Sequence, residues 1–160
     1  MSGKEGFIQR FGAVYEDSPW VAEAVWPGAG ALRNAQALAG AMAAVVDSAT
    51  REDRLALIRA HPQLASRARM ADASVREQSG AGLDQCSPQE FADFQRLNAA
   101  YNDRFGFPFI IAVKGLTRHD ILDAFAARLG NDPDVEFDEA IRQIHRIAAF
   151  RLADLFEDAS

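Results

Sequence analysis

The stretch PDVEFDEAIRQIHRIAAFRLADL, residues 133–155, decides the fold class of this 160-residue chain. At 100° per residue its apolar side chains gather along one face, which is typical of an amphipathic helix packed on a core. The predicted helix follows Gly130-Asn131-Asp132-Pro133 and runs to about Leu155. Its buried stripe is expected to consist of Phe137, Ile141, Ile144, Ala148, Leu152 and Leu155.

Helix start signals recur through the rest of the chain. Each places a capping hydroxyl before a proline or three residues before an acid: Ser18-Pro19, Thr50-x-x-Asp53, Ser87-Pro88-Gln89-Glu90 and Thr117-x-x-Asp120. A long Ala/Leu/Met segment, roughly Ala31 to Val46, predicts a mostly buried helix. The helix after Thr50 should end near His61, because Pro62 follows. We therefore expect an all-α fold, a single-domain helical bundle of about seven to eight helices over residues 1–160.

Composition and charge exclude several classes of partner. Apolar residues make up 49% of the chain and charged residues 25%, which is ordinary for a soluble globular protein. The net charge of −6 and the absence of a Lys/Arg-rich run argue against nucleic acid and anionic membranes as partners. A small anionic substrate is compatible with this charge if a cation lies nearby. The single cysteine, Cys86, excludes an internal disulfide and a Cys-based metal site.

No targeting or membrane signal is found in the sequence. The N-terminal residues Met1-Ser2-Gly3-Lys4-Glu5 lack the apolar core of a signal peptide. The longest apolar stretches, around residues 35–46 and 105–113, are too short to span a bilayer. The chain does not end in Ser-Lys-Leu. These observations predict a cytoplasmic protein.

His61 is the strongest candidate for acid/base chemistry. A helix must stop there because Pro62 follows, and such a position can aim an imidazole into a cavity. The alternative is a hydrogen-bonded histidine with a structural role. His119 is expected to be solvated in a first helical turn, and His145 lies at the border of the last helix's apolar stripe.

Two segments do not fit a helical pattern. The first, Ser74–Leu83, contains Ser74-x-x-Glu77, which matches a capping box, but Gly80 and Gly82 should limit that helix to little more than one turn. Glu77 and Gln78 could therefore present a carboxylate and an amide together. The second, Phe105–Gly115, is apolar yet interrupted by Gly and Pro. We interpret it as a buried connection whose free backbone donors could form the wall of a small-molecule pocket.

Arg151 stands at the edge of the apolar stripe in the last helix, seven residues after Ile144. A cation at such a border usually extends its charged end to solvent or pairs with an internal acid, but it could equally bind a substrate carboxylate through two hydrogen bonds. Both interpretations stay open from the residues alone. No zinc-protease, serine-hydrolase or phosphate-loop motif and no metal-ligand spacing is found, so we expect no metal and no cofactor.

Five segments, taken together and in order, resemble one protein family. They are Tyr15-Glu16-Asp17-Ser18-Pro19-Trp20-Val21-Ala22-Glu23, His61-Pro62-Gln63-Leu64-Ala65, Ser74-x-x-Glu77-Gln78-x-Gly80-Ala81-Gly82-Leu83, Leu97-Asn98-x-x-Tyr101-x-x-Arg104-Phe105-Gly106-Phe107-Pro108-Phe109, and Arg151-Leu152. The chain is similar over nearly its whole length to the 2-oxo-4-hydroxy-4-carboxy-5-ureidoimidazoline (OHCU) decarboxylases. Five segments in the family's order are much more specific than any one of them.

The resemblance implies an all-α, cofactor-free decarboxylase of urate degradation that forms (S)-allantoin, commonly as a homodimer. It assigns His61 as catalytic acid and Glu77 as its partner. It also implies substrate contacts from Pro62, Ser74, Gln78, the backbone of Phe109, Ile110, Ile111, Ala112 and Val113, and Arg151. The alternatives are a non-catalytic helical binding module that retains the pocket, and a related decarboxylase or tautomerase acting on another ureido-imidazole substrate.

Overall fold

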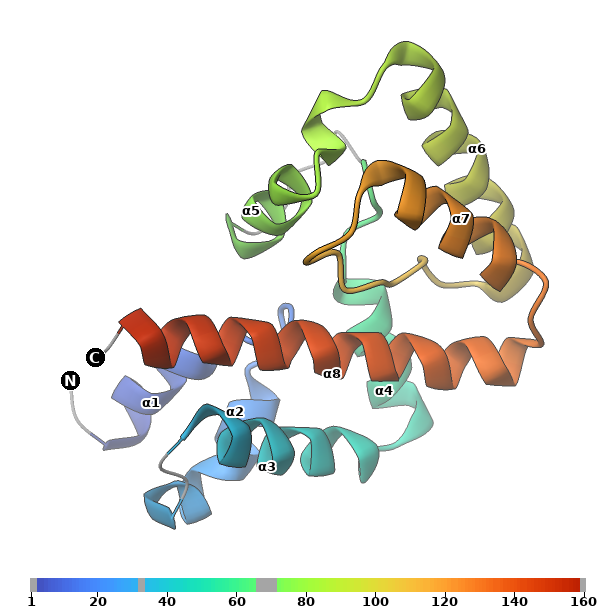
Figure 1. Cartoon of the computed structure of the whole chain (residues 1–160). Helices are drawn as coiled ribbons and strands as arrows, with labels where there is room; N and C mark the ends of the chain where they lie inside the picture. The colour runs from blue at the N-terminus through green and yellow to red at the C-terminus, as the bar shows by residue number, and fades with distance from the viewer. Residues whose placement is uncertain (1–2, 32–33, 66–71, 159–160) are drawn as a thin grey trace. The chain divides into compact units, whose positions relative to one another are not determined.

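The structure is a computed structural model that describes residues 3–31, 34–65 and 72–158. Helices make up the regular structure of these residues, and no strand occurs among them (Figure 1). In chain order they are α1 (Gly3–Phe11), α2 (Trp20–Val25), the 3₁₀ helix η1 (Trp26–Ala31), α3 (Ala35–Asp47), α4 (Arg51–Ala60), α5 (Asp72–Gly80), the 3₁₀ helix η2 (Leu83–Gln85), α6 (Pro88–Phe105), α7 (Arg118–Arg128) and α8 (Pro133–Asp158). The prediction of an all-α fold is confirmed.

The chain forms two compact units. The first comprises Met1–Ala60 and Ile144–Ser160, and the second comprises His61–Gln143, so α8 contributes residues to both. Within the first unit α2 packs against α1 and α3, and within the second α6 packs against α7. That the whole chain acts as a single domain stays a prediction.

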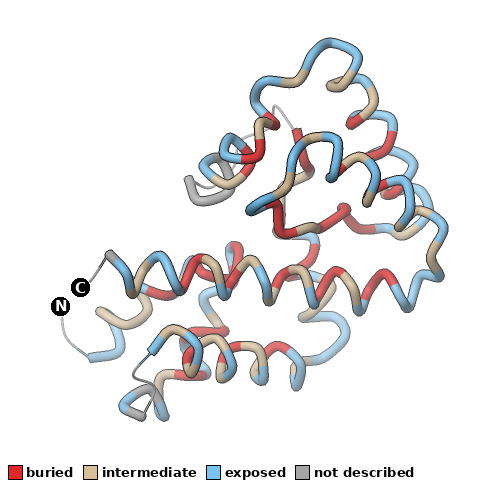
Figure 2. The backbone as a smooth tube through the Cα atoms, in the orientation of Figure 1, coloured by how far each residue is buried: buried red, intermediate tan, exposed pale blue. Residues whose placement is uncertain are grey.

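The last helix forms as the sequence indicates. Figure 2 shows buried positions recurring along α8. They include Phe137, Ile141, Ile144, Ala148 and Leu152 of the predicted stripe, together with Glu136, Ala140 and Arg151. Leu155, the sixth member, is only half-buried. No helix in the described ranges is long and apolar enough to cross a membrane.

Three of the four start signals cap a helix. The Thr50 hydroxyl accepts a hydrogen bond from the Asp53 N–H at 3.1 Å, at the start of α4. Ser87 and Thr117 form complete capping boxes at the starts of α6 and α7, each with the acid three residues later. These caps satisfy N–H groups that a helix leaves without partners in its first turn.

Ser18 does not act as predicted. Its hydroxyl donates to the Glu16 carbonyl at 2.8 Å, and α2 begins after Pro19 without a side-chain cap. A serine hydroxyl can bind a backbone carbonyl two residues away instead of capping a helix, and this local bond is the one that Ser18 makes.

Other helix boundaries also differ from the predicted ones. The segment expected to be helical from Ala31 begins at Ala35 instead, with Asn34 as N-cap, because the Asn34 side chain accepts from the Ala37 N–H. The helix around Glu77 has nine residues, since α5 starts at Asp72. Ser74 therefore lies inside α5, so of the two interpretations of Ser74-x-x-Glu77 the capping box does not form. The helix α1 was not expected from the sequence.

The connection between α6 and α7 is irregular and buried, as predicted. Helix α6 ends at Gly106, whose φ of 77° is the left-handed conformation that glycine adopts readily. Of the residues from Phe107 to Val113, only Ile111 is not fully buried. The Phe109 ring stacks on Phe125 of α7, with 3.9 Å between centroids and 9° between planes. We call residues 107–113 the wall segment.

Candidate active site

His61 lies directly after α4, which ends at Ala60, so the predicted helix end is confirmed. The residue is only 6% exposed. Burial of a titratable group in a small helical protein is uncommon unless the group has a structural or chemical role. Pro62, the next residue, is half-buried.

Three side chains fasten the backbone that follows His61. The Asn98 amide of α6 donates to the Leu64 carbonyl at 3.0 Å, and the Gln95 amide donates to the Ala65 carbonyl at 3.4 Å. The Ala65 N–H in turn donates to the Gln78 side-chain oxygen at 3.0 Å. Ala65 has a φ of 55°, so a non-glycine residue is held in the left-handed region. The backbone around His61 is thus fixed from two helices.

The Ala65–Gln78 hydrogen bond joins the His61 segment to α5, the helix that carries Glu77. Gln78 is buried, whereas Glu77 is half-buried. The structure therefore places both predicted catalytic residues in the same unit, on two segments that share a direct contact. Ser74 lies in α5 as well, and its side chain is outside the described structure.

Arg118 of α7 fixes the bend after α5. It donates to the Gly82 carbonyl at 3.1 Å and to the Glu90 carboxylate at 3.2 Å. Hydrogen bonds from the Ser87 backbone and from Arg118 hold the pKa of Glu90 below its usual value. Gly82 has a φ of 81°, and a Cβ there would lie 2.7 Å from the Arg118 Nη1 atom. Only glycine fits this bend without moving Arg118.

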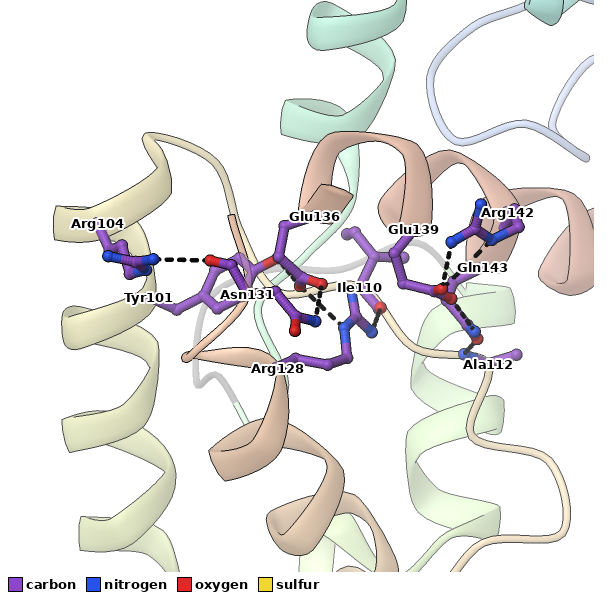
Figure 3. A network of polar contacts seen from close by, with 10 residues as sticks. All are labelled: Tyr101, Arg104, Ile110, Ala112, Arg128, Asn131, Glu136, Glu139, Arg142 and Gln143. Atoms are coloured by element: carbon purple, nitrogen blue, oxygen red, sulfur yellow. Dashed lines mark hydrogen bonds and ion pairs between the residues drawn. The ribbon is translucent and has the colours of Figure 1, made fainter. Parts of the chain in front are cut away.

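The wall segment is held by two side chains, shown in Figure 3. The Arg128 Nη1 atom donates to the Ile110 carbonyl at 2.6 Å. The Gln143 Oε1 atom accepts from the Ala112 N–H at 3.0 Å. The Ala112 N–H is therefore bound within the protein, and a contact between Ala112 and substrate stays a prediction.

Behind the wall segment lies a buried polar cluster (Figure 3). The Glu136 side chain is 0% exposed and accepts from Arg128 at 2.9 Å, the Tyr101 hydroxyl at 2.6 Å and Asn131 at 3.1 Å. Burial, followed by the hydrogen bond to Glu136, raises the pKa of Tyr101 well above its usual value. The Arg128 guanidinium also lies 4.4 Å from the centre of the Phe109 ring. This cluster has the contacts of a structural support.

Arg151 belongs to the other unit and is 8% exposed. Its Nη1 atom lies 2.9 Å from the Glu16 carboxylate and 3.3 Å from the Val14 carbonyl. Glu16 is itself only 4% exposed. Of the two interpretations of Arg151, the pairing with an internal acid is the one seen here, and its contact with substrate stays a prediction.

The other two histidines lie elsewhere. His119 is exposed, as predicted. His145 lies 2.7 Å from the Tyr15 hydroxyl through Nδ1 and 2.9 Å from the Asp47 carboxylate through Nε2. Burial, and then the nearby Asp47 charge, raises the pKa of Tyr15. These contacts link α3, α8 and the segment before α2, and they give His145 a structural role.

Sequence reasoning missed the residues that support the site from behind, namely Gln95, Asn98, Arg118, Arg128 and Gln143. Asn98 lies in the segment that begins Leu97-Asn98-x-x-Tyr101. An amide beside Phe94 and Leu97, on the apolar face of a helix, could have indicated a buried hydrogen-bonding role. The other four offered none, since each bonds a backbone group at least 18 residues away.

Comparison with known proteins shows where the chain belongs. The model of a family described as OHCU decarboxylase matches residues 2–153. This chain is a member of that family. The resemblance read from the five sequence segments is thereby confirmed.

The family's named members include close relatives of this chain. A 2-oxo-4-hydroxy-4-carboxy-5-ureidoimidazoline decarboxylase of Haloferax volcanii is 42% identical over 152 residues, covering 95% of this chain and 90% of that protein. The uric acid degradation bifunctional protein PucL of Bacillus subtilis is 45% identical over 150 residues, covering 92% of this chain. This chain spans 30% of that longer protein's length.

Solved structures of the family have the same fold. A crystal structure of (S)-allantoin synthase matches 96% of this chain and 51% of that one, with a TM-score of 0.79 and 32% identity. A crystal structure of OHCU decarboxylase in the presence of (S)-allantoin matches 90% of this chain and 95% of that one, with a TM-score of 0.74 and 26% identity.

Proposed function

We propose that this chain decarboxylates OHCU to (S)-allantoin in urate degradation. The observation that carries the proposal is the match to the OHCU decarboxylase family over residues 2–153. The relative from Haloferax volcanii, named for this reaction, adds support because the similarity covers 90% of its length.

The substrate explains why few protein groups suffice. OHCU carries its carboxylate on a ring carbon next to a C=N bond. When the carbon–carbon bond to the carboxylate breaks, its electron pair forms a C=C bond in the ring, and the C=N electrons move to nitrogen, which takes up a proton. A proton then adds to the ureido-bearing carbon while the ring hydroxyl loses its proton and becomes a carbonyl. The substrate therefore contains its own electron sink, and we propose that no cofactor and no metal take part.

His61 is the proposed general acid that delivers the proton to the ureido-bearing carbon. Its burial supports this role, because a proton donor fixed over one ring face yields a single enantiomer. The proposed role of Glu77 is to orient or polarise the substrate beside His61. The hydrogen bond between Ala65 and Gln78 supports a joint site, since it connects the two segments that carry these residues.

The proposed substrate contacts are Pro62, Ser74, Gln78, backbone groups of residues 109–113, and Arg151. Gln78 accepts from the Ala65 N–H, and this bond holds its side chain beside the segment that follows His61. Arg151 is assigned to the ureido or ring oxygen, because a tight clamp on the departing carboxylate would oppose the loss of CO2.

The family resemblance and the net charge also support proposals about the compartment, the oligomeric state and the partners of this protein. We propose a cytoplasmic homodimer whose ligand is a small molecule, with no nucleic acid and no membrane as partner. The net charge of −6 supports the exclusion of polyanionic partners.

Circular dichroism on freshly generated OHCU tests the activity. Catalysis should give optically active allantoin faster than buffer alone. The His61→Asn variant should stay folded and turn over roughly 10²-fold more slowly or worse, the usual scale for losing a general acid. The Glu77→Gln variant keeps the shape of the side chain and should also be severely impaired.

Two outcomes would contradict this assignment. If the parent protein is no faster than buffer, the decarboxylase proposal fails, and a non-catalytic binding module or an enzyme for another ureido-imidazole becomes the better explanation. If a folded His61→Asn variant keeps near-normal turnover, His61 is not the acid even if the reaction is right.

A further inference from the structure

We infer that Arg128 and Gln143 are positioning residues that turn the peptide N–H of Ile111 toward the substrate. The inference rests on the proposed function, because it takes the wall segment to be part of the substrate site. It concerns two side chains that lie behind the wall segment.

The two contacts bracket Ile111. Arg128 binds the carbonyl of Ile110, the residue before it, and Gln143 binds the N–H of Ala112, the residue after it. These two bonds commit the backbone groups on either side of Ile111 to the protein. Between them the chain has neither helical nor turn structure. The Ile110 carbonyl and the Ile111 N–H belong to the same trans peptide, in which the two groups point in opposite directions, so the bond to Arg128 turns the Ile111 N–H away from Arg128.

Ile111 is less buried than its neighbours, as expected if its backbone faces a ligand. It is half-buried, whereas the other residues from Phe107 to Val113 are fully buried. Its N–H makes no hydrogen bond to any residue in the described parts of the chain. Buried or half-buried backbone donors normally have partners, so a donor of this kind in an apolar segment is suited to a ligand oxygen.

The supports are themselves held in one orientation. The Gln143 Nε2 atom donates to the Glu139 carboxylate at 2.7 Å. Because a carboxylate only accepts, this bond turns the amide oxygen of Gln143 toward the Ala112 N–H. Burial alone would raise the pKa of Glu139, but its hydrogen bonds outweigh that effect and the pKa is lowered, which keeps the acceptor ionised. Arg128 is fixed in the same way by the buried Glu136.

A hydrogen bond from Ile111 to a ring carbonyl would set the height and tilt of the ring relative to the proton donor. Loss of a support would let the wall segment shift and would misalign the ring. Misalignment slows proton delivery and lets solvent protonate either ring face, so it lowers both turnover and the enantiomeric excess of allantoin.

The decisive variant is Gln143→Met, which keeps the length of the side chain but can neither accept from Ala112 nor donate to Glu139. We expect kcat/KM to fall on the order of 10- to 100-fold, a weaker inhibition by allantoin, and a lower enantiomeric excess after the buffer reaction is subtracted. A purely structural role would lower the active fraction without changing the enantiomeric excess of what that fraction makes.

Arg142→Met is the matched control. Arg142 directly precedes Gln143 in α8, is 62% exposed, and binds the other oxygen of Glu139 at 2.7 Å. Its removal should leave kcat/KM and enantiomeric excess as in the parent. Arg128→Lys is a second test variant. Lysine keeps a positive charge beside Glu136 but lacks the planar guanidinium that also reaches the Ile110 carbonyl. It should therefore lower kcat/KM and enantiomeric excess as Gln143→Met does.

The outcomes separate this inference from the proposed function. An inactive parent protein would refute the function itself. An active parent with a Gln143→Met variant of unchanged kcat/KM and enantiomeric excess would overturn the positioning role alone. A variant that loses activity but keeps full enantiomeric excess, or variants at both positions that fail to fold, would also overturn it, since the supports would then serve folding only.

Discussion

Two buried arginine–glutamate pairs, one in each unit, fasten an irregular segment to a helix. Arg128 of α7 binds Glu136 and the carbonyl of Ile110, and Arg151 of α8 binds Glu16 and the carbonyl of Val14. The pairs differ in what they hold and in how deeply the acid is buried. Arg128 holds the wall segment in the unit that contains His61, with Glu136 0% exposed, whereas Arg151 holds the segment before α2 in the other unit, with Glu16 4% exposed.

The comparison of Arg128 with Arg151 shows that sequence position alone does not tell whether a buried arginine supports the fold or the substrate site. Arg151 attracted a functional assignment because it interrupts an apolar stripe and lies in a family motif, yet its contacts are those of an internal ion pair. Arg128 attracted none, although it reaches the backbone that the proposed substrate would touch. A guanidinium carries five donors, so one residue can support a structure and bind a ligand at once.

The largest effect should follow from Arg128→Met. This change leaves the fully buried Glu136 without its cation, and an uncompensated buried charge costs about 3–5 kcal/mol of unfolding free energy. For a chain of this size the melting temperature should fall by roughly 10 °C. Thermal melts followed by circular dichroism measure the effect. An unchanged melting temperature would contradict the need for a cation beside Glu136.

Arg151→Met should have a smaller effect on stability, about 3 kcal/mol, if pairing with Glu16 is its whole role. Affinity for allantoin should then be unchanged. If Arg151 also binds substrate, allantoin binding should weaken by about 1.5–3 kcal/mol, the range for a hydrogen bond to a charged group. Melting temperature and product-inhibition constant, measured on the same variant, distinguish the two roles. A large drop in melting temperature with unchanged affinity would remove Arg151 from the site.

The smallest effect should follow from Tyr101→Phe. It deletes one of the three hydrogen bonds to Glu136 but leaves those from Arg128 and Asn131 in place. The loss should be about 1–2 kcal/mol, since the carboxylate keeps its cation. Urea titration gives the number. A loss as large as that of Arg128→Met would show that the hydroxyl and the cation act as one coupled unit.

The parts of the fold that follow from the sequence are those with local, fixed-spacing signals. The stripe of α8 and the capping boxes at Ser87 and Thr117 depend on residues three or four positions apart, and all of them formed. Ser18 failed because a carbonyl two residues away offered its hydroxyl another partner. Helix α5 came out longer than expected because the glycines after Glu77 limit only its end.

The candidate site likewise contains residues that the sequence indicated and residues that it did not. His61 and Glu77 carry the family motifs and lie in the same unit, and their catalytic roles stay a prediction. The residues behind them were not predictable, because a side chain that bonds a distant backbone carbonyl leaves no spacing pattern. Arg128 and Ile110 are 18 positions apart, and Gln143 and Ala112 are 31 apart. Such contacts are fixed by tertiary packing alone.

The wall segment offers its polar groups through the backbone rather than through side chains. Point mutation exchanges side chains but leaves every peptide N–H in place, proline excepted. Residues 109–113 can therefore drift among apolar types over evolutionary time without erasing the hydrogen bonds they offer. New ligand preferences would arise more readily by moving the helices that carry Arg128 and Gln143 than by altering the residues nearest the ligand.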